Sequence, residues 1–220
     1  MRHALAVTAL SASIGAVVCA HGSGDAITWN REISRLVIDK CASCHRPDGS
    51  AFSLLTYKDA QPRANGIKAA VLARTMPPWG AVKGFGNFRN DQSLSQEQIE
   101  LITKWVDGGI RRGNNPALLP KPPEFKPAPQ TTSTAAVRIS GAVTLDRAIV
   151  LDGLFPEKVP PGQSFQVSAV LPNGHVEPLL WLHGYDARFV HPFLLRTPLR
   201  LPAGTVIRGV PSNAVLVLLS

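Results

Sequence analysis

The chain has 220 residues, of which 45% are hydrophobic and 17% are charged, and its formal net charge is +8. This composition excludes an intrinsically disordered protein and allows one or two domains with a buried core. The 19 prolines and 18 glycines indicate many turns, a linker, or both. A basic surface suits acidic partners, although it can serve solubility alone. Basic and aromatic residues do not alternate as they do in nucleic-acid-binding proteins, so we expect no nucleic-acid partner.

The first twenty residues have the features of an export signal peptide. Arg2 precedes an uncharged apolar run, Ala4–Val18, and Val18-Cys19-Ala20 fits the rule for cleavage after Ala20. The run is shorter than the ~20 residues that a membrane-spanning helix needs, and an uncleaved anchor is the alternative. No later stretch is long and apolar enough to span a bilayer. We expect a periplasmic or otherwise exported protein whose formal charge falls from +8 to +7 with the loss of Arg2.

The next ninety or so residues predict helices. Apolar spacing favours one helix over 28–46 and a second over 56–74. The strongest signal covers Gln96–Asp107, because Ser95 and Gln98 have the spacing of a capping box. We therefore expect a helical domain over 26–112.

The composition changes after residue 112. Residues 113–135 predict a semi-rigid linker, because six prolines fall there: Pro116, Pro120, Pro122, Pro123, Pro127 and Pro129. From 136 to 220 the pattern predicts an all-β domain, a complete or partial sandwich. The expected strands are Val137–Thr144, Arg147–Phe155, Ser164–Leu171, Val176–Leu182, Phe189–Leu195, Thr205–Val210 and Ala214–Leu219. Nothing follows to cover the last one, which suggests a shortened relative of a longer protein.

The motif that indicates chemistry is Cys41-Ala-Ser-Cys44-His45. This C-x-x-C-H spacing is the one expected for c-type haem attachment. The two thiols add to the haem vinyl groups, and the adjacent imidazole ligates the iron. A zinc ribbon would need a second Cys/His pair, which the chain lacks. A thioredoxin-like redox pair would need a βαβ context, which is also lacking. We therefore expect one covalent haem, held by Cys41 and Cys44, with His45 as proximal ligand.

Met76 is the candidate for the distal iron ligand. It is the only methionine after residue 20, and it lies between a predicted helix and Pro77-Pro78. A rigid turn there can hold a thioether over the iron, and a His–Met pair raises the reduction potential and leaves no open position. The alternative is a core methionine that fills a gap. Trp79 and Trp105 are candidates for packing on the haem edge or, equally, for ordinary core positions.

A family resemblance can be stated from these residues. The stretches "HRPDGSAFSLLTYKDA", "ARTMPPW" and "LSQEQIELITKWVDGG" resemble a class I cytochrome c domain of the type fused to copper type II ascorbate-dependent monooxygenase-like domains in exported bacterial proteins. The resemblance covers about 28–130. It implies an all-α cytochrome c-like haem domain, and it assigns haem attachment to Cys41 and Cys44 and iron ligation to His45 and Met76.

The second half resembles part of the copper domain of those monooxygenases. Where the family has a His-x-His pair, this chain has Pro156-Glu157-Lys158-Val159, and the methionine of the copper site is also missing. His175, His183 and His191 are spaced like ordinary surface or strand-end histidines. We therefore expect no copper and doubt monooxygenase activity.

Three kinds of function stay open. We favour an electron carrier, in which the haem passes single electrons to or from a redox partner, possibly an acidic protein. An enzyme would need a copper site or an open iron position, and a haem-bearing binding or sensor module is the third class. Four cations are candidates for a docking face around the haem: Lys68, Arg74, Lys83 and Arg89.

Overall fold

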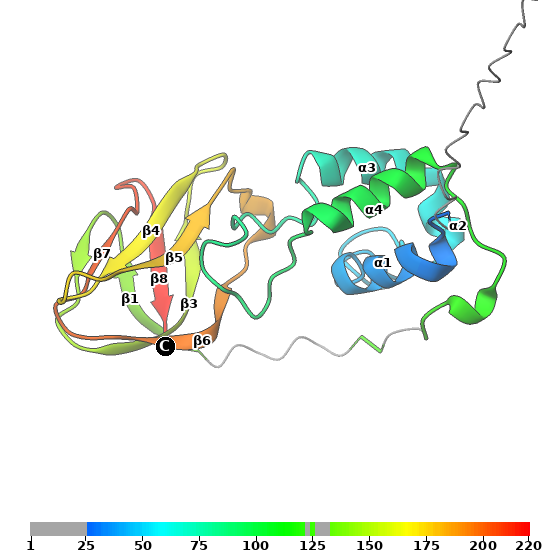
Figure 1. Ribbon diagram of the computed structural model, residues 1–220. Coiled ribbons are helices and arrows are strands. Elements are labelled where there is room, and N and C mark those ends of the chain that lie inside the picture. The colour runs from blue at the N-terminus through cyan, green and yellow to red at the C-terminus, as the bar shows by residue number, and fades with distance from the viewer. Residues whose placement is uncertain (1–25, 122–123, 126–132) are drawn as a thin grey trace, which may run out of the picture.

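The computed structural model describes residues 26–121, 124–125 and 133–220, and the expected signal peptide lies outside them. A helical part and a β sandwich stand next to each other (Figure 1). Part of the expected linker, 126–132, is also outside the described residues. The domain limits inferred from the sequence stay a prediction.

The helical part consists of short elements joined by long loops. A π-helical turn, Trp29–Ile33, leads into α1 (Ser34–Lys40), and α2 (Tyr57–Ala60) passes through a 3-10 turn into α3 (Ala64–Leu72). The longest helix is α4 (Gln96–Asp107), whose bounds match the prediction. Its capping box forms as expected, since Ser95 and Gln98 exchange side-chain-to-backbone hydrogen bonds. These helices bury a small core around Trp29 and Trp105.

The β part is a two-sheet sandwich. One antiparallel sheet has the order β1-β8-β3-β6 and the other β2-β7-β4-β5. The strands are β1 (Ala135–Ile139), β2 (Val143–Thr144), β3 (Ile149–Lys158), β4 (Phe165–Val170), β5 (Val176–Leu182), β6 (Phe193–Leu201), β7 (Val206–Arg208) and β8 (Val215–Leu219). Inward-facing apolar side chains such as Leu151, Val167 and Leu180 are fully buried between the sheets.

The predicted fold class, an all-α cytochrome c-like domain followed by a partial β sandwich, is wrong. The first part has only short helices, and one of its loops belongs to the β core. Ala81 pairs with Leu182 of β5, and Phe88 pairs with Leu195 of β6. Since β5 and β6 are each an edge strand of one sheet, segment 80–89 joins one edge of each sheet.

The sandwich also differs from the partial one that was predicted. The last strand, β8, was expected to lie uncovered, yet it lies between β1 and β3 and pairs with both. Its side chains from Leu216 to Leu219 are buried. Each sheet has four strands, and backbone hydrogen bonds run from segment 80–89 to the edge of each. These hydrogen bonds satisfy some of the backbone groups that the β5 and β6 edges would otherwise expose.

A bidentate ion pair reinforces this junction. Nη1 and Nη2 of Arg89 each donate to a carboxylate oxygen of Asp152 in β3, at 2.8 Å. Arg89 also donates to the backbone carbonyl of Leu195, and Ser133 donates to Asp152. The hydrogen bonds from Arg89, together with that from Ser133, lower the pKa of Asp152 to about 2.

This pKa predicts how acid affects the junction. The folded pKa lies below the usual 3.8, so the ion pair stabilises the fold above pH 4 and loses its effect as the pH falls through 2. We expect Asp152→Asn to lower the free energy of unfolding by about 1–2 kcal/mol at pH 7. The difference from the unmodified protein should shrink below pH 4. Urea unfolding at pH 7, 4 and 2 measures it, and an unchanged difference at pH 2 would contradict the assignment.

Candidate functional site

The C-x-x-C-H motif forms a tight turn at the end of α1. Cys41 caps the helix and donates its backbone N–H to the carbonyl of Val37 at 2.9 Å. The N–H of His45 then donates to the carbonyl of Cys41, also at 2.9 Å. The chain returns alongside, because Ala51 N–H donates to Cys44 and Leu54 N–H to His45. The motif and residues 46–54 therefore form one closed loop, which we call the attachment loop.

Gly49 is needed where the attachment loop turns back. A Cβ at this position would lie 2.3 Å from the backbone oxygen of Cys44. Asp48, just before it, has a left-handed backbone with φ of 59°. The turn therefore relies on the absence of a side chain beside the second cysteine. An Asp-Gly pair favours a turn in any sequence, but its contact with the motif has no sequence signature.

We expect Gly49→Ala to disturb the attachment loop. A methyl group cannot fit against the carbonyl of Cys44, so the backbone around Cys44 must shift. The yield of haem-bearing protein should fall several-fold, and haem staining per unit of immunodetected protein measures it. Gly66→Ala is the control, because Gly66 has no left-handed backbone and a Cβ there would meet nothing within 4 Å. A full haem yield for Gly49→Ala would contradict the role given to the close approach.

The two thiols are free and differ in environment. Neither Cys41 nor Cys44 is in a disulfide, and both are partly buried. Burial first, then the charge of Asp39 and the neighbouring Cys44, raises the pKa of Cys41 to about 11. Cys41 is therefore a neutral thiol at neutral pH, which makes it a weak nucleophile without assistance.

His45 is held by its δ nitrogen. Nδ1 lies 3.0 Å from the backbone carbonyl of Phe52, and the two rings pack edge to face at 4.7 Å. A carbonyl partner fixes the tautomer with the proton on Nδ1, which leaves Nε2 as the nitrogen that can bind iron. Metal-ligating histidines commonly have such a partner. Sequence reasoning missed the Phe52 carbonyl, because a backbone acceptor has no residue signature.

The Arg46 side chain also stabilises the motif. Its guanidinium donates to the carbonyls of Ala42 and Ser43. It also lies 4.5 Å from the centre of the Phe125 ring, so the segment after the helices contacts the attachment loop. Arg46 therefore covers the carbonyls between the cysteines, a role that the sequence did not indicate.

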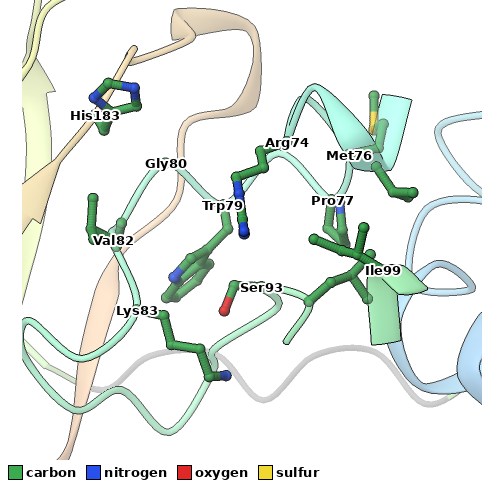
Figure 2. A pocket seen from close by; sticks show the side chains of 13 residues that line it. Arg74, Met76, Pro77, Trp79, Gly80, Val82, Lys83, Ser93, Ile99 and His183 are labelled. Atoms are coloured by element: carbon green, nitrogen blue, oxygen red, sulfur yellow. The ribbon is translucent and has the colours of Figure 1, made fainter. Parts of the chain in front are cut away.

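Met76 lies beside a cleft between the helical part and the sandwich. It follows α3, is partly buried, and lines a cavity of about 320 Å³ (Figure 2). Trp79, Lys83, Ser93 and His183 also line this cavity. Cys41, Cys44 and His45 are not among its described lining residues. The structure thus brings Cys41, Cys44 and His45 together, and it does not place Met76 in one cavity with them.

The attachment loop has the donors that a covalent haem requires. It presents two unpaired thiols at the expected spacing and an imidazole whose Nδ1 is occupied by a carbonyl. Only Cys41, Cys44 and His45 are shown to fit a covalent haem. The role of Met76 as an iron ligand stays an expectation from the sequence. The structure places Trp79 in the sandwich core and Trp105 in the helical core.

The histidines of the sandwich have separate partners. His175 contacts Glu177, and His183 contacts the hydroxyl of Ser164. His191 contacts the carbonyl of Phe189 and stacks on Trp79, and burial lowers its pKa. Across the described ranges, no three His, Cys, Asp or Glu side chains are grouped to hold a metal ion.

The proposed docking cations are mostly engaged within the chain. Lys68 pairs with Asp107 and Lys83 with Asp91, while Arg89 pairs with Asp152. Arg74 donates to the side chain of Gln96. Three of the four therefore already face a carboxylate, and their role in docking stays a prediction.

In the part of the chain that the structure describes, no helix has the length and apolarity to cross a bilayer.

Comparisons with family models, curated proteins and solved structures found no match to this chain.

Proposed function

We propose that the chain is an exported c-type cytochrome that carries one covalent haem and passes single electrons to or from a redox partner. The observation that carries this proposal is the attachment loop, where Cys41 and Cys44 are unpaired and His45 is oriented through Nδ1. The likeness of the motif and its flanks to haem-containing relatives of copper monooxygenases is part of the proposal. The proposal rests on the motif and does not require a cytochrome c fold.

Each residue of the loop has a defined task in this proposal. Cys41 and Cys44 would hold the haem through thioethers, and His45 would present Nε2 to the iron. The haem, when bound, supplies a one-electron couple between ferric and ferrous iron. The carbonyl of Phe52, 3.0 Å from Nδ1, would keep the imidazole in one tautomer in both states. Met76 is proposed as the second protein ligand, which would leave no position for a substrate.

An electron carrier needs a stable coordination in both oxidation states, whereas an enzyme needs an open position. The test is the visible spectrum of the exported protein, oxidised and reduced, with and without carbon monoxide. We expect a low-spin spectrum in both states and no change on adding carbon monoxide. A high-spin spectrum that changes at once with carbon monoxide would overturn the carrier proposal in favour of an enzyme.

A further inference from the structure

Segment 80–89 leaves the helical part and becomes part of the sandwich. The N–H of Val82 donates to Trp181, and the N–H of His183 donates to Gly80, on the β5 edge. On the β6 edge, Arg89 N–H donates to Leu194, and Arg196 N–H donates to Asn87. These four backbone hydrogen bonds, of 2.8–2.9 Å, fasten both ends of the segment to the sandwich.

Trp79 anchors the start of this segment in the sandwich core. Its side chain is only 4% exposed. The indole stacks on His191 with a ring separation of 5.0 Å and an interplanar angle of 18°. It also meets Phe193 and Phe88 edge to face, at 5.1 and 5.8 Å. An aromatic side chain buried among three rings has one position only, so it fixes the backbone that carries it.

Met76 lies directly before this anchor. Only Pro77 and Pro78 separate it from Trp79, and each proline ring fixes φ. On the other side, Thr75 and Met76 donate their N–H groups to the carbonyl of Ala70 in α3. The Met76 backbone is thus held between α3 and the sandwich, with little freedom in either direction (Figure 2).

We infer that the β sandwich positions the Met76 segment, with Trp79 and Arg89 as positioning residues. This assigns a task to residues 133–220, and it rests on the proposed function, in which Met76 binds the iron. If Met76 binds the iron, loosening either residue would weaken that bond and leave the covalent attachment through Cys41 and Cys44 intact. Any small ligand that competes with Met76 then binds more tightly.

Imidazole added to the ferric protein measures this competition. We expect Arg89→Ala to raise the apparent imidazole affinity about tenfold, the factor that corresponds to one lost charge-assisted contact. Trp79→Ala should raise it further, and Trp79→Phe, which keeps a ring in the core, should stay close to the unmodified protein. Arg138→Ala is the matched control, because Arg138 pairs with Glu157 within the sandwich and far along the chain from this segment. It should leave the affinity unchanged.

The outcomes separate the inference from the proposed function. Met76→Ala should bind imidazole most tightly of all. If Met76→Ala binds it no better than the unmodified protein, Met76 is not a ligand and the proposed coordination fails. If Met76→Ala binds tightly but Arg89→Ala and Trp79→Ala match Arg138→Ala, the positioning role is overturned while the coordination stands. Circular dichroism of each variant shows whether the sandwich is folded, and a folded Arg89→Ala protein is sufficient for the comparison.

Discussion

Replacing both Cys41 and Cys44 by alanine is expected to abolish all covalently held haem in the exported protein. No thioether can form without the two thiols, and both thiols are free in the attachment loop. The measurement is haem staining after denaturing electrophoresis, which removes any haem held only by contacts. We expect the signal to fall below one hundredth of that of the unmodified protein.

The control for this experiment lies between the two cysteines. Ser43 is exposed and belongs to the same turn, so Ser43→Ala tests the turn without removing an attachment point. It should keep the full haem signal. Haem that stays with the denatured double variant would mean that the C-x-x-C-H motif is not the attachment site.

Replacing Met76 by alanine is expected to have the second largest effect. The variant should keep its covalent haem, because Cys41 and Cys44 are untouched. It should lose the weak long-wavelength absorption of the oxidised protein that marks a methionine on haem iron. Its reduction potential should fall by on the order of 100 mV, because axial ligands tune haem potentials over about 0.8 V.

A nearby apolar truncation separates ligation from packing. Leu72 is at the end of α3 and is 53% exposed, so Leu72→Ala removes a side chain close in sequence without touching the proposed ligand. That variant should keep both the absorption band and the potential. If Met76→Ala behaves like Leu72→Ala, the sixth ligand must come from another residue.

The elements governed by local signals could be predicted from the sequence. Helix α4 was placed with both ends correct, because the capping box of Ser95 and Gln98 is a local pattern. Strand β5 was also placed correctly, since its apolar run is bounded by turn residues. The ends of β6 were missed, because its pairing with β3 continues to Leu201 beyond the predicted Leu195.

Long-range pairing explains the wrong fold class. Segment 80–89 contains Gly84, Gly86 and Asn87, residues that favour turns and give no strand pattern. Its place between β5 and β6 is set by partners about one hundred residues away, Leu182 and Leu195. No periodicity within the segment shows such a contact. The buried Trp79 was the one signal available, and it was interpreted as equally suited to a haem edge or an ordinary core.

The candidate site could be found because its residues are close in sequence. The motif spacing alone singled out Cys41, Cys44 and His45, and the structure keeps them in one loop. The contacts that hold these three residues in place could not be predicted from the sequence. The contact of Nδ1 with the Phe52 carbonyl uses a backbone atom, and the need for Gly49 depends on how the loop folds back on Cys44.

The central claim is that this chain carries haem covalently at the attachment loop. Its most direct test is the intact mass of the exported protein, expressed with c-type maturation machinery and denatured before measurement. The account predicts the mass of the processed chain plus one haem, and the mass of the processed chain alone for the variant without Cys41 and Cys44. A processed chain that carries no added haem mass under these conditions would contradict the account.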